Sequence, residues 1–135
     1  MGDGPRAAAT DLYRATPPMP PLDVTTEPRG DQLRVVLAGE LDIVNAPRLE
    51  EQLVALEADD VGTLILDLRA LDFIDSTGLR TLIAANERAR SAGRRLVVVR
   101  GAKAVDRLLS LTQLDQRLEI VDDPDAVSAQ PVNGD

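Results

Sequence analysis

The 135-residue chain contains neither cysteine nor histidine. Without cysteine it has no disulfide, no thiol nucleophile and no thiolate metal site. Without histidine it lacks the Ser-His-Asp triad, the commonest general base and the commonest zinc ligand. Lysine, which can act as a base, occurs once, at Lys103. The chain therefore lacks the residues on which much of standard enzyme chemistry depends, and we expect neither catalysis nor a cofactor.

Aromatic residues and long apolar runs are also scarce. Tyr13 and Phe73 are the only aromatic residues, and the net charge is −8. Bases would find little to stack on, so we expect no direct binding of nucleic acid. No run approaches the roughly eighteen apolar residues of a transmembrane helix, and the proline-rich start does not match a signal peptide. These absences predict a cytoplasmic protein without a membrane partner.

Charge is unevenly distributed along the chain. Between residues 40 and 75 there are ten acidic residues and two arginines, whereas between residues 80 and 107 there are eight basic and two acidic residues. Ordinary solvated helix faces would produce such segments. A dipolar domain whose acidic side meets a basic partner would produce them too.

The apolar pattern predicts one domain between two tails. Residues 1–20 combine a proline cluster with no apolar periodicity, which is typical of a disordered leader, and residues 129–135 are predicted to form a flexible tail. In the predicted domain, residues 21–128, short apolar runs indicate strands at 22–27, 33–38, 64–68, 95–99 and 118–121. Helical periodicity indicates a helix capped by Asn45 and ending near residue 59, and further helices at 76–92 and 102–110.

The resulting ββαβαβαβ order predicts an α/β fold. Strands that alternate with helices form a mixed, mainly parallel sheet, here of about five strands. The first two strands, joined by a short turn, are expected to form an antiparallel hairpin. The helices are expected to bury their leucines, including Leu56 and Leu108.

Polar residues gather after two of these strands. Gly39-Glu40-Leu41-Asp42 is expected to form one loop, and residues 69–75, with Asp72 and Asp75, a second. In open α/β sheets the loops at the carboxyl ends of strands carry function, so both acidic loops are expected on one face.

The second loop leads into Asp75-Ser76-Thr77 at the start of a predicted helix. Helix capping alone explains these residue types. A hydroxyl at a helix start is also exposed, and the positive end of the helix dipole favours an added phosphate there. Residues 74–78 lack the Gly-x-Ser-x-Gly pattern of a nucleophile elbow. The spacing of Asp42, Asp72 and Asp75 matches no metal motif, and we expect no metal.

The Gly-Glu-Leu-Asp segment and Leu-Asp-Phe-Ile-Asp-Ser-Thr-Gly-Leu at 71–79 resemble the STAS-domain anti-sigma-factor antagonists of bacteria, over about residues 22–128. The resemblance implies an STAS-like fold and a cycle of partner exchange. The unmodified protein would bind an anti-sigma factor, a serine kinase with a histidine-kinase-like ATPase fold, and so free a sigma factor. The kinase would phosphorylate Ser76 and release the protein, and a metal-dependent serine phosphatase would reset it.

The same resemblance implies where the partner binds and where this chain departs from the family. The implied partner-binding residues are Glu40, Asp42, Asp72, Asp75, Ser76, Thr77 and Gly78. Gln113 precedes Leu114 where the family often has glycine, and the leader is longer than usual.

Two other interpretations stay open. Some STAS domains are phosphorylation-independent scaffolds or subunits of transport or stress complexes. A receiver domain would use Asp67 or Asp75 as a phosphoryl acceptor. It would also need an acidic pair after its first strand, which Glu27 followed by Pro28 does not provide.

Overall fold

The computed structural model describes residues 21–127, which fold into five strands, three α-helices and two short 3-10 helices. The elements are, in chain order, β1 (Asp23–Arg29), β2 (Gln32–Leu41), α2 (Ala46–Glu57), β3 (Thr63–Ile74), α3 (Ser76–Ala92), β4 (Arg95–Val99), α4 (Lys103–Leu111), η1 (Leu114–Gln116), β5 (Glu119–Val121) and η2 (Pro124–Ala126). The expected order of strands and helices is confirmed. The predicted leader, residues 1–20, and tail, residues 129–135, lie outside the described residues.

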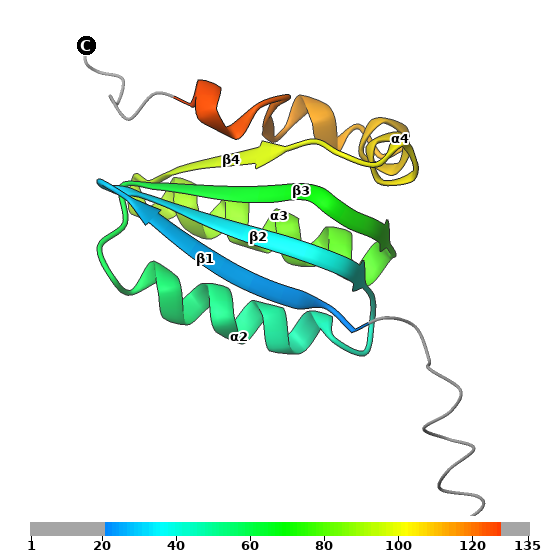
Figure 1. Cartoon of the computed structure of the whole chain (residues 1–135), viewed down its shortest axis with the longest axis horizontal. Helices are drawn as coiled ribbons and strands as arrows, with labels where there is room; N and C mark the ends of the chain where they lie inside the picture. The colour runs from blue at the N-terminus through cyan, green and yellow to red at the C-terminus, as the bar shows by residue number, and fades with distance from the viewer. Residues whose placement is uncertain (1–20, 128–135) are drawn as a thin grey trace, which may run out of the picture.

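The five strands form one sheet in the sequential order β1-β2-β3-β4-β5 (Figure 1). β1 and β2 are antiparallel, and the other neighbours are parallel, as expected for a mixed sheet that opens with a hairpin. A receiver domain has the strand order 2-1-3-4-5. The observed order therefore argues against the receiver interpretation.

One face of the sheet carries the main hydrophobic core. Every second residue of each central strand points into it, because side chains alternate between the two faces of a strand. The strand residues are Leu33, Val35, Leu37, Leu64, Leu66, Leu68, Leu96 and Val98, and α2, α3 and α4 add Leu49, Leu53, Leu79, Leu82, Ala85, Ala89, Val105 and Leu109. Figure 1 shows α3 behind the sheet with α2 beside it. Leu56 and Leu108, expected to be buried, are only partly buried at the edge of this core.

β2 and β3 are longer than their apolar patterns predicted. β2 continues to Leu41 and β3 to Ile74, so most of the two segments expected as loops are strand. The extra lengths pair with each other, with shifts of register between Val36 and Ala38 and between Gly39 and Glu40. Such irregularities let a strand continue past residues that break the alternation. Only short junctions are left between these strands and the helices that follow.

No α-helix of residues 21–127 packs on the other face of the sheet, which is partly covered by the last described residues. Val127 packs on a small second core of Ile65, Val97 and Val99. The Gln32 Nε2 donates a hydrogen bond to the Val127 carbonyl at 3.2 Å. Asp125 of η2 pairs with Arg29 and Arg34 at 3.0 and 2.8 Å, and these bonds hold the pKa of the Asp125 carboxyl below its usual value.

Gln113, the departure from the family pattern, has φ 62° and ψ 18° in the left-handed region. Glycine adopts this conformation at lower cost than any residue with a Cβ. The family's preference for glycine therefore coincides with a backbone requirement in this chain. The end of α3 meets the same kind of requirement with Gly93, at φ 70°.

Asp67 is a buried carboxylate on the helix-free face, 1% exposed. Burial alone raises its pKa, but the side-chain and backbone hydrogen bonds of Arg69 and the charges of Arg69 and Arg34 together lower it below the usual value. The Arg69 guanidinium lies across both carboxylate oxygens at 2.8–3.2 Å. The buried Asp67 carboxylate is thus paired with an arginine whose own side chain is half exposed.

We predict that Arg69→Ala lowers the free energy of unfolding by about 2–4 kcal/mol at neutral pH, because it leaves a buried charge without its main partner. The folded pKa of Asp67 lies below the ordinary 3.8, so this contribution is present above that pH and is lost as the pH falls through the folded pKa. Urea unfolding between pH 7 and pH 3 should show that the difference in unfolding free energy between wild type and variant becomes smaller as the pH falls.

The matched control is Arg107→Ala, which removes an exposed arginine of α4. It should change the free energy of unfolding by no more than about 0.5 kcal/mol. A loss of stability in Arg107→Ala as large as that in Arg69→Ala would contradict the proposed role of the Asp67–Arg69 ion pair. So would a difference in stability between wild type and Arg69→Ala that does not change with pH.

Candidate functional site

The carboxylate of Asp75 joins the junction between β3 and α3 to the loop between β2 and α2. Its Oδ1 accepts a hydrogen bond from the Gly78 N–H at 2.9 Å, which caps the first turn of α3. Its Oδ2 accepts from the Ile43 N–H at 3.0 Å, and the Asp75 N–H donates to the Leu41 carbonyl at 3.1 Å. The structure therefore brings the two acidic segments together at one edge of the sheet.

Ser76 is the first residue of α3, and its side chain is exposed. Because the Asp75 carboxylate caps the helix, the Ser76 hydroxyl is not required for capping. Thr77 is half-buried, and its carbonyl accepts a hydrogen bond from the Thr81 hydroxyl at 3.2 Å. Of the two neighbouring hydroxyls, that of Ser76 is the more accessible to another protein.

Gly78 is buried where α3 approaches the ends of β2 and β3 most closely. A Cβ at this position would lie 2.7 Å from the Leu41 Cγ and 2.7 Å from the Ile74 Cγ1. Both of these leucine and isoleucine side chains are themselves buried in the core. Glycine is therefore needed for the close approach of helix and sheet directly beneath Ser76.

The loop between β2 and α2 is held by reciprocal hydrogen bonds of Asp42 and Asn45. The Asp42 Oδ1 accepts from the Val44 and Asn45 N–H groups at 3.0 and 3.2 Å. The Asn45 side chain accepts from the Asp42 N–H at 2.9 Å and donates to the Glu40 carbonyl at 2.8 Å. Asn45 was expected to cap α2, but its side chain makes no capping bond to that helix and stabilises the loop instead.

This hydrogen-bonded loop presents two apolar side chains to solvent. Ile43 is 67% exposed and Val44 is 83% exposed, and Phe73 at the end of β3 is 42% exposed. Sequence reasoning missed all three, because it weighed the acidic residues around them. The available signal was an Ile-Val pair in a segment where no helix or strand period could bury it.

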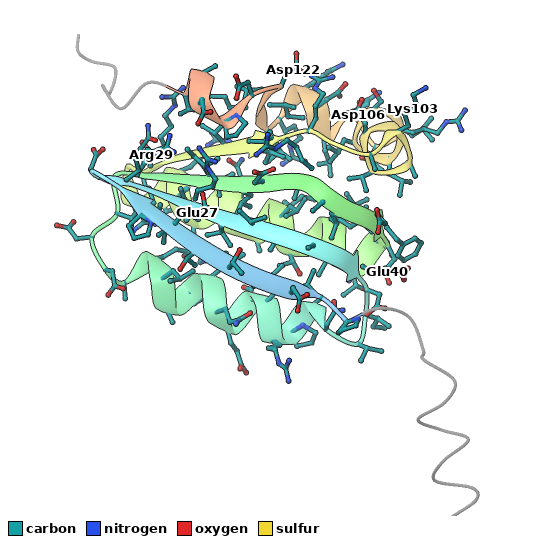
Figure 2. All side chains as sticks on the ribbon, in the orientation of Figure 1. Glu27, Arg29, Glu40, Lys103, Asp106 and Asp122 are labelled. Atoms are coloured by element: carbon teal, nitrogen blue, oxygen red, sulfur yellow. The ribbon has the colours of Figure 1, made fainter. Side chains whose placement is uncertain are left out.

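Glu40 and Asp72 lie on the ends of β2 and β3 rather than in loops. Figure 2 shows Glu40 at the edge of the sheet where the arrowheads of β2 and β3 lie, and its register partner is Phe73. The Glu40 Oε1 is buried without a hydrogen-bond partner among the described residues. Asp72 is exposed, so its carboxylate adds negative charge to this edge.

A shallow groove runs between α2 and α3 beside Ser76. Its walls are mostly small, and its charged residues are Glu50 and Arg80; the lining residues are Ala46, Pro47, Glu50, Thr77, Arg80, Thr81 and Ala84. Glu50 is held by Arg88, which also binds Glu57, so that Arg88 ties the two helices together. Nowhere in residues 21–127 do three acidic side chains gather closely enough to hold a metal ion.

Comparison with known proteins places the fold and this site in context. The family described as STAS domain matches residues 23–126. RsfB, an anti-sigma-F factor antagonist of Mycobacterium tuberculosis, is 33% identical over 84 residues, which are 62% of this chain and 68% of RsfB. The anti-sigma-B factor antagonist of Listeria monocytogenes is 30% identical over 90 residues, 67% of this chain and 79% of that protein.

A solved structure agrees with these relatives. The crystal structure of an anti-sigma factor antagonist from Mycobacterium paratuberculosis superposes with a TM-score of 0.71 at 30% identity, over 78% of this chain and 89% of that one. The chain belongs to the STAS domain family. Within that family it is similar to the anti-sigma factor antagonists, as the two acidic segments had indicated. No described helix has the length and apolar character needed to cross a membrane.

We predict that Gly78→Ala destabilises the domain by about 1–3 kcal/mol, because the added methyl group overlaps buried side chains. In an unconstrained helix the same change stabilises by about 1 kcal/mol. A loss of stability rather than a gain would therefore indicate that the added methyl group overlaps its neighbours. Thermal unfolding would measure it. A variant as stable as the wild type, or more so, would show that α3 can move away from the sheet at no cost.

Proposed function

We propose that this protein is a cytoplasmic anti-sigma factor antagonist that binds its anti-sigma factor through the surface around Ser76 and acts through binding rather than catalysis. The names of its relatives support the general role. The observation that carries the finer proposal is the exposed Ser76 hydroxyl at the start of α3, beside a loop with exposed apolar side chains that is hydrogen-bonded to Asp75. In this proposal the partner is a serine kinase with a histidine-kinase-like ATPase fold, and a metal-dependent serine phosphatase reverses the modification.

Affinity for the partner would come mainly from Ile43, Val44 and Phe73. Large apolar side chains that lose water at the centre of an interface carry most of the binding energy. Basic groups of the partner opposite Asp72 would speed association, while the part of the partner opposite Ser76 would carry an acidic group or bound nucleotide.

Phosphorylation of Ser76 would weaken this complex through charge. A phosphate adds about −1.5 to −2 charges. Two unit charges at roughly 8 Å interact by about 2 kcal/mol at an effective dielectric of about 20. An acidic group or bound nucleotide on the kinase at that distance would therefore weaken binding more than roughly tenfold. The phosphate would not unfold the domain, because the start of a helix favours negative charge.

We predict that Ser76→Ala binds the anti-sigma factor kinase persistently in the presence of ATP, whereas Ser76→Asp binds roughly tenfold or more weakly than wild type. The alanine variant cannot receive the phosphate, and the aspartate variant carries part of its charge permanently. Kinase labelling followed by titration calorimetry of the purified pair would measure both effects.

Thr77→Ala is the matched control, since it removes the neighbouring hydroxyl and should still accept phosphate at Ser76. Phosphate found on Thr77 would contradict the assignment of the acceptor. Equal affinity of the alanine and aspartate variants at Ser76 would leave the phosphorylation-independent scaffold as the better description.

We also predict that Val44→Ser weakens binding of the anti-sigma factor by roughly tenfold, a loss typical of a buried apolar contact at an interface. Val44 is exposed, so the melting temperature should not change. The control is Val54→Ser, which removes another exposed valine, 46% accessible, from the far half of α2. An equal loss of affinity in both variants would argue against the loop as the contact.

A further inference from the structure

Arg80 is a cation beside the modification site whose role the proposed cycle does not explain. It follows Ser76 by four positions on α3, and both side chains are exposed. It also lines the groove between α2 and α3. Within residues 21–127, Arg80 forms no ion pair with a carboxylate at the site.

Two carboxylates of this region, Glu50 and Asp75, bind other groups. Glu50, on the opposite wall of the groove, is bound to Arg88 at 2.6 Å. Asp75 uses one oxygen for the Gly78 N–H and the other for the Ile43 N–H. Arg80 is therefore available for an anion that arrives at Ser76.

The spacing along α3 suits such a contact. Residues four apart on a helix are neighbours, with Cβ atoms about 5–6 Å apart, and an acidic group preceding a basic one is the favourable orientation. Leu79 and Leu82 turn toward the core, so Ser76 and Arg80 both lie on the outer side of the helix. A guanidinium also matches two phosphate oxygens at once.

We propose that Arg80 binds the phosphate on Ser76 within the same helix, an inference that rests on Ser76 being the modified residue. In the unmodified protein Arg80, which has no ion-pair partner among residues 21–127, would be available to an acidic group of the anti-sigma factor. In the modified protein it is held by the phosphate. Modification then changes the surface twice: an anion is added, and the cation beside it is withdrawn from the partner.

The test uses full-length protein in which phosphoserine is incorporated at position 76 during translation, so that no kinase is required. Phosphorus NMR between pH 4 and pH 8 gives the second pKa of the phosphate. A nearby cation favours the doubly charged form, so Arg80→Gln should raise this pKa by about 0.3–0.5 unit relative to wild type. Arg80→Lys keeps the positive charge but loses the planar guanidinium that can bind two phosphate oxygens, so the phosphate pKa should lie between those of wild type and Arg80→Gln.

The control is Arg90→Gln, which makes the same change on an exposed residue of the same helix. Arg90 lies fourteen positions after Ser76, about 21 Å along the axis and beyond the screening length of about 10 Å, so this variant should leave the pKa unchanged. Equal pKa values in wild type and Arg80→Gln, or an equal shift in Arg90→Gln, would overturn the pairing. Failure of the kinase to label Ser76 would instead overturn the proposed cycle, with the Arg80-dependent pKa shift unaffected.

Discussion

One carboxylate, that of Asp75, fixes the geometry on which the rest of the site depends. It accepts one backbone hydrogen bond from Gly78, in the first turn of α3, and another from Ile43, 32 residues before it in the sequence. A carboxylate suits this position because both of its oxygens are acceptors, whereas an asparagine would place an NH₂ group against one of the two donors. The bridge sets both where α3 begins and how the loop after β2 lies beside it.

The residues of the two acidic segments and the loop between them fall into two groups: some make contacts within the fold, and others are exposed. Carboxylate oxygens of Asp75 and Asp42 accept hydrogen bonds from backbone amides, and Gly78 is buried against the core. Ser76 and the apolar side chains of the loop are left facing outward. Three of the residues that the family pattern implies as partner-binding, Asp42, Asp75 and Gly78, therefore have structural roles, whereas Ile43 and Val44, which lie outside the two family segments, are exposed.

The sequence was sufficient for the centres of the strands, the identity of the helices and the position of Ser76, because these follow from apolar periodicity and capping chemistry. It was insufficient for the carboxyl ends of β2 and β3. Glu40 and Asp72 resemble loop residues; pairing of Glu40 with Phe73, and of Gly39 with Leu71, keeps this part of β2 and β3 in the sheet, with Asp72 between the two pairs. Ile43 and Val44 were missed although their position outside any helix or strand period was a signal of exposure, and the hydrogen bonds that hold the loop in place are visible only in three dimensions.

The described segment enters and leaves the sheet at opposite ends. The Pro21 backbone lies against Gly39, near the end of β2 that carries the site, whereas Val127 is bound by Gln32, the first residue of that strand. Seven residues of strand, roughly 23 Å, separate these two points. A fluorescent reporter attached at Val127 would thus lie about the length of the strand away from the edge of the sheet that carries Ser76, whereas one attached at Pro21 would lie near that edge.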